Sequence, residues 1–170
     1  MALRRRINLC LIVIFSLVFA VQASSHNRQN VAPDPVKWSL QFQPRQKFYR
    51  KRAPFKVQII ARIQPGWHLY ALDEIPNGPR PTRITLPAEQ PFELAGEITQ
   101  PAPMMKFDEN FGVETQFYQV SATFLAPLKI SATAKAGATK LVVQARYQTC
   151  NEHLCLPPKT VRLEAPLTIK

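Results

Sequence analysis

Hydrophobic and polar residues alternate with a period of two along much of the chain. The clearest run covers residues 55–63, where apolar and polar side chains alternate with Ile60 as the exception. The same alternation occurs over residues 118–124, 141–147 and 161–169. Because successive side chains of a β-strand point to opposite faces, each run predicts a strand with one face in the core and one in water.

Turn-forming residues divide the rest of the chain into shorter strand candidates. These candidates cover residues 36–42, 67–72, 82–86 and 92–98. Proline and glycine stand between them, as in Pro65-Gly66. No long run has the period of an amphipathic helix. Eight or nine short strands, each with a wet face, therefore predict one all-β domain, an antiparallel β-sandwich.

The start of the chain predicts a secretory signal peptide over residues 1–23. Three arginines at positions 4–6 precede an apolar stretch, and Ala23 offers a small residue for cleavage. The stretch is too short to span a bilayer comfortably, so a retained membrane anchor is the less favoured alternative. We therefore expect an exported protein with a loosely ordered lead at 24–35 and a folded domain at 36–170.

The net charge of the chain is strongly positive. The formal charge is +11, and removal of the three leader arginines leaves +8. Such a charge favours acidic partners or an anionic membrane surface. The basic residues are scattered, however, and the densest group, between positions 45 and 52, lies at a predicted turn without a base-reading motif. We interpret that group as a solvated loop and expect no nucleic-acid partner.

Two cysteines remain once the leader, with Cys10, is removed. Cys150 and Cys155 are separated by four residues, a length that can close a hairpin between a strand ending at Tyr147 and one starting at Lys159. The Cα atoms of such a pair can reach the roughly 5.5 Å separation of a disulfide. Since exported proteins meet oxidising conditions, the pair is predicted to be able to bond with itself.

The position of this disulfide bears on its purpose. In the chain-entropy model, a bond closing a six-residue loop stabilises the fold by about 2 kcal/mol, against about 4.7 kcal/mol for a loop of 100 residues. The pair therefore lies where it contributes little to stability but is presented at a loop tip. This favours a redox role through thiol–disulfide exchange. The alternative is a non-catalytic binding module with a structural disulfide.

Metal handling is a second alternative. Cys150, His153 and Cys155 offer two thiols and an imidazole that suit copper(I), with Met104 and Met105 elsewhere in the chain. A structural zinc site normally has four clustered ligands, and only three are clustered here. We therefore expect no bound metal and interpret His153 as a polar loop residue.

Three motifs add a resemblance to a known family. They are PGWHLY at 65–70, FDENFG at 107–112, and YQTC at 147–150 followed by CLPP at 155–158. In these motifs and their order the chain resembles the N-terminal periplasmic domain of the bacterial transmembrane disulfide reductase DsbD. The resemblance implies an immunoglobulin-like fold, which agrees with the predicted sandwich, and a periplasmic location.

The resemblance also implies a role for each cysteine. Cys155 would form the mixed disulfide with a partner and Cys150 would resolve it, giving a protein-disulfide reductase that needs no cofactor. The implied electron donor is membrane-embedded or thioredoxin-like, and the acceptors are oxidised periplasmic thioredoxin-fold proteins. Because the resembled protein continues into a membrane domain and this sequence ends at Lys170, we expect a separate membrane carrier as donor. We also expect a monomer.

In the family an aromatic cap covers the cysteines, from a loop that matches residues 108–112. Phe111 is the strongest candidate for this cap and Phe107 the second, because Asn110 stands where many relatives have another aromatic residue. A lid of this kind would exclude small thiols and would have to swing away for a partner. The alternative is that the two phenylalanines are ordinary core residues.

Other residues of these motifs are expected near the cysteines. Asp108 and Glu109 would add negative charge, which disfavours a thiolate, although a solvated turn is the simpler alternative. Tyr70 and Trp67 are expected to line the site, but alternation makes at least one of them a core residue. Trp38 is assigned to the core.

Overall fold

The computed structural model of the chain describes residues 34–170. The predicted signal peptide, and all of the predicted lead except its last two residues, lie outside this range. The range is built from β-strands and loops. It contains no helix long and apolar enough to cross a membrane.

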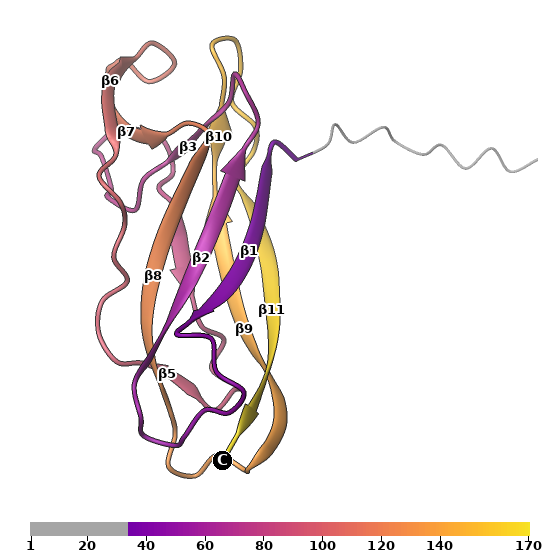
Figure 1. The fold of residues 1–170 in the computed structure, drawn as a ribbon. Helices are drawn as coiled ribbons and strands as arrows, with labels where there is room; N and C mark the ends of the chain where they lie inside the picture. The colour runs from indigo at the N-terminus through magenta and orange to yellow at the C-terminus, as the bar shows by residue number, and fades with distance from the viewer. Residues whose placement is uncertain (1–33) are drawn as a thin grey trace, which may run out of the picture. The chain divides into compact units, whose positions relative to one another are not determined.

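The strands form three antiparallel sheets, as Figure 1 shows. The first sheet has the order β1 (Val36–Gln43), β2 (Phe55–Ile63), β8 (Ser121–Ile130), β5 (Phe92–Leu94). The second has the order β10 (Thr149–Cys150), β3 (His68–Tyr70), β7 (Val113–Tyr118), β6 (Met104–Asp108). The third has the order β11 (Lys159–Ile169), β9 (Gly137–Tyr147), β4 (Arg83–Thr85).

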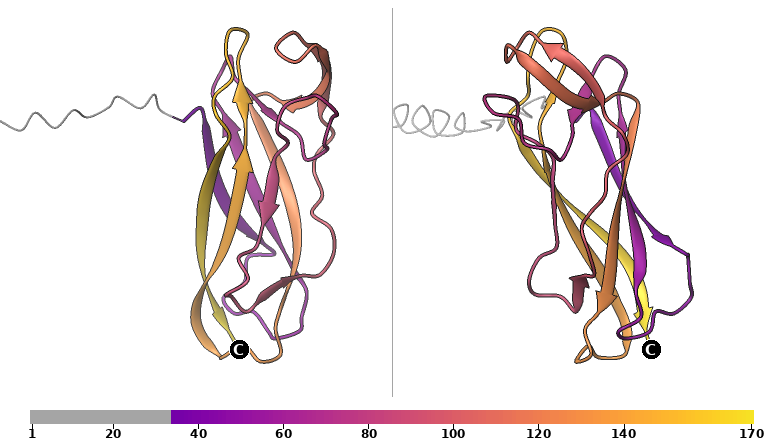
Figure 2. Two further views of the ribbon diagram at one scale, coloured as in Figure 1. Left: turned by 180° about the vertical axis from the view of Figure 1, so that it is seen from behind. Right: turned by 90° about the vertical axis from the view of Figure 1, so that its left-hand side faces the viewer.

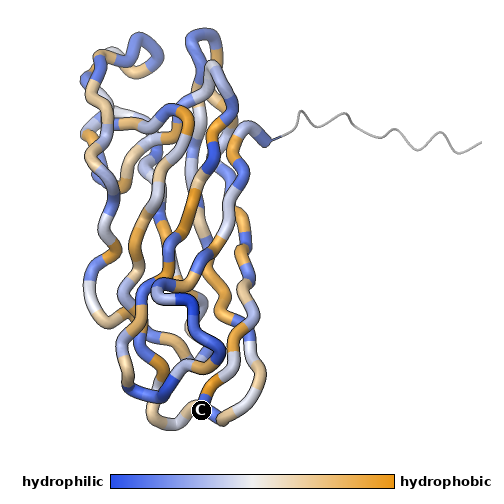
Figure 3. Tube along the Cα trace, in the orientation of Figure 1, coloured by the Kyte–Doolittle hydropathy of each residue, from blue (hydrophilic) through white to orange (hydrophobic). Residues whose placement is uncertain are grey.

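The first and third sheets enclose the hydrophobic core (Figure 2). Val57, Ile59 and Phe124 enter it from the first sheet, and Leu141 and Val143 from the third. The alternation that predicted these strands is visible along the chain in Figure 3. The buried face of each strand is its apolar one, so the predicted all-β antiparallel sandwich is confirmed.

One predicted strand is two strands in the structure. Residues 118–124 were expected to be continuous, but β7 ends at Tyr118 and β8 begins at Ser121 in a different sheet. Between them Val120 has a φ of 67° and is 77% exposed, where the pattern places an inward side chain. Tyr118 and Phe124 remain buried on either side of the turn, which is why the alternation conceals it.

Two edge strands also differ from the sequence prediction. β6 was not predicted, because four of its five residues are exposed and no alternation marks it. β5 covers only the first three residues of the predicted 92–98 segment. Both strands pair along one side only, so packing constrains their sequences less than it constrains central strands.

The second sheet lies at one end of the sandwich, at the top of Figure 1. A turn at Pro65-Gly66 leads from β2 into β3, and Gly66 adopts a φ of 82° that favours glycine. The β6–β7 hairpin and the segment with Cys150 and Cys155 both belong to this end. The second sheet therefore carries the cysteine segment at one edge and the β6–β7 hairpin at the other, with β3 between them.

The turn at Val120 gives a test of this arrangement. A left-handed backbone costs an L-residue about 1–2 kcal/mol, and the exposed Val120 side chain provides little packing in return. We expect Val120→Gly to raise the free energy of unfolding in urea by about 0.5–1 kcal/mol, after allowing for the greater freedom of glycine in the unfolded chain. Val120→Ala keeps the cost of the left-handed backbone, so its free energy of unfolding should rise less. A lower unfolding free energy for Val120→Gly would contradict this account.

Candidate functional site

Cys150 and Cys155 form a disulfide at the end of the second sheet. Their Cα atoms are 4.0 Å apart. The loop between them is closed by the Asn151 amide, which donates to the Leu154 carbonyl at 2.9 Å, so the predicted hairpin is confirmed. Cys150 is fully buried, whereas Cys155 is half-buried. Only one sulfur-bearing residue of the pair is therefore partly exposed to solvent.

Strand β3 places two ring side chains on the same face as Cys150. Cys150 lies opposite His68 in the β10–β3 pairing, and Tyr70 lies opposite Phe117 in the β3–β7 pairing. Directly opposed residues share a face, and residues two apart on a strand share it as well. Tyr70, Phe117 and Cys150 accordingly form a small cluster of their own, while Leu69 points to the main core.

The tip of the β6–β7 hairpin closes over this cluster. Phe111 is half-buried against it and meets the Tyr70 ring edge to face, with ring centres 6.0 Å apart. The turn is fixed by the Gly112 amide, which donates to the Asp108 carbonyl at 2.8 Å. Phe107 is 58% exposed and outside the cluster, so its interpretation as a core residue is wrong. The loop thus brings one of the two phenylalanines to the disulfide.

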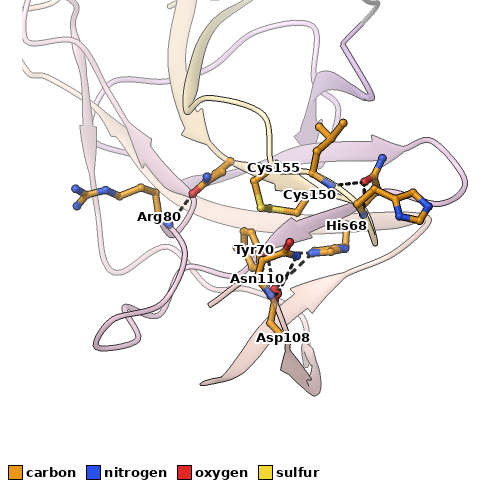
Figure 4. Close-up of a disulfide and its surroundings, with 11 residues drawn as sticks. His68, Tyr70, Arg80, Asp108, Asn110, Cys150 and Cys155 are labelled. Carbon is orange, nitrogen blue, oxygen red and sulfur yellow. Dashed lines mark hydrogen bonds and ion pairs between the residues drawn. A yellow bond between two sulfur atoms is a disulfide. The ribbon is translucent and has the colours of Figure 1, made fainter. Parts of the chain in front are cut away.

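The buried carboxylate of Asp108 organises the polar side of the site (Figure 4). Its Oδ2 accepts a hydrogen bond from the Tyr70 hydroxyl at 2.6 Å. Its Oδ1 accepts from the Asn110 backbone amide at 3.0 Å and from Asn110 Nδ2 at 3.1 Å. His68 Nε2 lies 3.0 Å from the Tyr70 hydroxyl and 3.8 Å from Asp108 Oδ2. Glu109, by contrast, is exposed at the hairpin tip.

The environment determines the charge of each of these groups. Burial, with the hydrogen bond to Asp108 and its charge, raises the pKa of Tyr70 far above its usual range, so the phenol stays protonated. Burial lowers the pKa of His68, and Lys106 lowers it further, although Asp108 acts in the opposite direction. Because the Tyr70 hydroxyl gives its one proton to Asp108, His68 Nε2 must be the donor in its contact with Tyr70.

His68 was not identified as a site residue from the sequence. The signal was present, because it lies two positions before Tyr70 in a predicted strand and must share its face. Of the two other aromatic candidates, Trp67 packs against the main core, as Trp38 does, and only Tyr70 faces the disulfide.

The two thiols and the imidazole considered for copper are not arranged as a metal site. Cys150 and Cys155 are bonded to each other, and the backbone amide of His153 donates to Asn151 Oδ1 at 2.8 Å within the exposed loop. Over the part of the chain that the structure describes, no three His, Cys, Asp or Glu side chains gather as ligands would. Met104 also lies on β6, outside this loop.

Comparison with known proteins identifies similar domains. The family described as "Thiol:disulfide interchange protein DsbD, N-terminal" matches residues 40–166. The N-terminal periplasmic domain of ScsB from Proteus mirabilis is similar with a TM-score of 0.50 and 16% identity, covering 77% of this chain and 46% of that one. The Neisseria meningitidis DsbD N-terminal domain in the reduced form gives a TM-score of 0.47 and 20% identity, covering 69% and 85%. No curated protein matches the chain. The family match and the antiparallel sandwich confirm the immunoglobulin-like fold.

The packing of Phe111 leads to a prediction about access to the sulfurs. We expect Phe111→Ala to speed oxidation of the reduced dithiol by a small disulfide such as oxidised glutathione, because the ring then no longer covers the cluster. The rate is measured by alkylating samples at intervals after the disulfide is added and determining the fraction of thiol that remains reduced. Phe107→Ala is the matched control, since it removes an exposed ring from the same hairpin and should leave the rate unchanged. Equal rates for all three proteins would show that Phe111 is not a lid.

The environment of His68 leads to a prediction about pH. Its pKa in the folded protein lies below the usual value, so the unfolded chain binds the proton more readily as the pH falls. The contribution of His68 to stability is therefore present at pH 7 and is lost as the pH drops below about 6.5. We expect the free energy of unfolding to fall between pH 7 and pH 5, and to fall less in His68→Gln.

The exposed His153 supplies the control for this experiment. His153→Gln is measured beside it, because this variant also removes one histidine but leaves the residues around His68 unchanged, its side chain lying in the exposed hairpin loop. Urea unfolding at several pH values measures all three. Identical slopes for the unaltered protein and His68→Gln would refute the assignment.

Proposed function

The chain belongs to the family of the N-terminal domain of the thiol:disulfide interchange protein DsbD, and on this basis we propose that Cys150 and Cys155 pass electrons to oxidised periplasmic proteins. The observation that carries the proposal is the unequal burial of the pair. Cys150 is fully buried and Cys155 is half-buried, so a partner disulfide can reach Cys155 first. Cys150 is then available to resolve the mixed disulfide.

The energetics of the hairpin support a reactive rather than a structural bond. The bond closes a six-residue loop, which stabilises the fold by about 2 kcal/mol in the chain-entropy model. The main core is complete without it, because Cys150 and Cys155 belong to a separate cluster. Opening the disulfide therefore costs the sandwich little.

The proposed exchange proceeds in two displacements. The thiolate of Cys155 attacks one sulfur of the partner disulfide, and the other partner sulfur leaves as a thiolate. Cys150 then loses its proton and attacks the Cys155 sulfur, which releases the second partner thiolate and forms the disulfide seen here. Two electrons pass from the dithiol to the partner, and the two partner thiolates take up the two protons. A donor dithiol reverses the steps to restore the reduced form.

The surrounding residues would control when this exchange occurs. Phe111 packs over the cluster that contains Tyr70 and Cys150, and the buried charge of Asp108, bonded to Tyr70, disfavours a thiolate. A docked partner that displaces the hairpin tip would remove the cover. Glu109, exposed at that tip, would be among the first side chains a partner meets.

The cellular setting is part of the same proposal. We propose that residues 1–23 are a cleaved signal peptide, that 24–35 are a flexible lead, and that 36–170 form the periplasmic exchange domain. The leader's arginines and apolar stretch support export. The family supports a membrane-embedded or thioredoxin-like donor and thioredoxin-fold acceptors.

Single cysteine variants test the mechanism. Cys155→Ala should reduce the rate of insulin reduction to that measured without protein, because the attacking sulfur is absent. Cys150→Ala should form mixed disulfides that persist, since nothing resolves them, and these appear as slower bands on non-reducing gels. The double variant should trap nothing. If Cys155→Ala keeps its activity and Cys150→Ala traps no partner, the disulfide is structural.

A further inference from the structure

A concentrated positive charge lies at the end of the sandwich farthest from the disulfide. The loop between β1 and β2 carries five exposed cations, here called the basic pole: Arg45, Lys47, Arg50, Lys51 and Arg52. Figure 1 places this loop beside the C-terminus, at the opposite end from β10, and Figure 3 shows it as a strongly hydrophilic segment. The exchange mechanism makes no use of it.

The charge of the basic pole is not neutralised within the described residues. No acidic residue occurs between positions 44 and 54, and no cation of the pole forms an ion pair in the part of the chain described. Cations elsewhere behave differently, since Lys129 pairs with Glu93 at 3.2 Å and Lys140 with Glu164 at 3.1 Å. The field of the basic pole is therefore free to attract an external anion.

The loop is ordered, which changes its interpretation as merely a solvated turn. Tyr49 at its centre is 3% exposed and packs between Phe42 and Phe55, with ring centres 5.1 and 4.9 Å away. Its amide donates to the Thr168 carbonyl at 2.9 Å, and its carbonyl accepts from the Lys170 amide at 2.9 Å. A fixed backbone holds the cations together, so less conformational entropy is lost when they engage a partner.

The tip of the loop is held in an uncommon conformation. Arg52 has a φ of 61°, a left-handed geometry that non-glycine residues seldom adopt, and its amide donates to the Ile130 carbonyl at 3.0 Å. The turn from Arg50 to Ala53 projects three consecutive cations outward.

An open pocket accompanies the charge. It has a volume of about 740 Å³, lies beside Arg45 and Lys47, and is lined by apolar side chains, among them Leu40, Phe42 and Leu167, and by polar side chains from the same strands. Cations next to a partly apolar pocket suit an amphiphile, which has an anionic head and a hydrocarbon body. They suit a nucleic acid less, because no base-reading motif is present.

We propose that the basic pole docks the domain on a membrane surface rich in anionic phospholipid, with the disulfide end facing away. Lys and Arg residues near such a surface each strengthen binding by roughly fivefold. Because the pole lies at the opposite end from β10, whose Cys150 is bonded to Cys155 (Figure 1), a docked domain leaves its reactive sulfur open to partners. The proposal concerns a different surface from the exchange site and does not depend on the redox function.

Vesicle binding tests the proposal. We expect the unaltered domain to sediment with vesicles of phosphatidylglycerol and phosphatidylcholine in equal amounts, but not with phosphatidylcholine alone, and the binding should weaken with added salt. The triple variant Arg50→Gln/Lys51→Gln/Arg52→Gln should bind about a hundredfold more weakly. The matched control is Lys37→Gln/Arg62→Gln/Arg146→Gln, which removes three exposed cations that lie on strands. Its affinity for the vesicles should fall much less.

Three results would overturn the proposal. The two triple variants could lose binding equally, which would show that net charge alone matters. The Arg50/Lys51/Arg52 variant could bind as the unaltered domain does. Soluble polyphosphate could bind more tightly than the vesicles, which would make the ligand a free polyanion.

Thiol labelling tests the orientation separately. In the reduced domain, labelling of Cys155 by a maleimide should proceed at the same rate with and without phosphatidylglycerol vesicles. Protection by the vesicles would place the disulfide end on the membrane and overturn the orientation. The triple variant of the pole should still reduce insulin in the absence of vesicles, which separates this proposal from the exchange mechanism.

Discussion

The site depends on a three-residue strand that pairs on both sides. β3 binds β10 through Leu69 and His68, and it binds β7 through Leu69 and Tyr70. Leu69 is fully buried in the main core, which fixes the register of the strand. A slip of one residue would turn Leu69 outward and Tyr70 inward, so the core enforces the position of Cys150 opposite His68. A contact in the sandwich thus decides the geometry of the sulfurs.

The buried charge of Asp108 adds a second constraint. A carboxylate removed from water is costly unless its oxygens are satisfied, and here three donors from two residues satisfy them. Two of these donors belong to Asn110 in the same turn, and the third is Tyr70 from β3. The hairpin is therefore tied to the sheet through a bond that only a protonated phenol can make.

The sequence predicted the parts of the fold that packing controls. Residues 55–63 were predicted with the observed bounds of β2, because both neighbours of that strand and the core constrain it. The break at Val120 was missed, because the buried residues on either side of the turn are still spaced by multiples of two, as they would be in one continuous strand. β6 was missed because an exposed edge strand needs no alternation.

The sequence predicted which residues gather at the candidate site better than it predicted the hydrogen bonds between them. The cysteine pair, its hairpin and the placement of Phe111 follow from spacing and from the family resemblance. The hydrogen bonds that link His68, Tyr70 and Asp108 join segments almost forty residues apart, as the separation of 38 between the last two shows. No local pattern encodes a contact of that kind, whereas the shared face of His68 and Tyr70 was readable from the strand period.

The two hydrophobic clusters explain how the sandwich can carry a reactive bond. Cys150 is held by backbone pairing to β3, and the tyrosine beside it is bonded to Asp108, so this half of the disulfide is fixed. Cys155 follows an exposed loop whose contacts are local, chiefly the hydrogen bonds that join Asn151 to His153 and Leu154. Both cysteines belong to the small cluster, whereas the main core is formed by other residues. A change at the sulfurs therefore acts on contacts that are separate from the packing that holds the sandwich together.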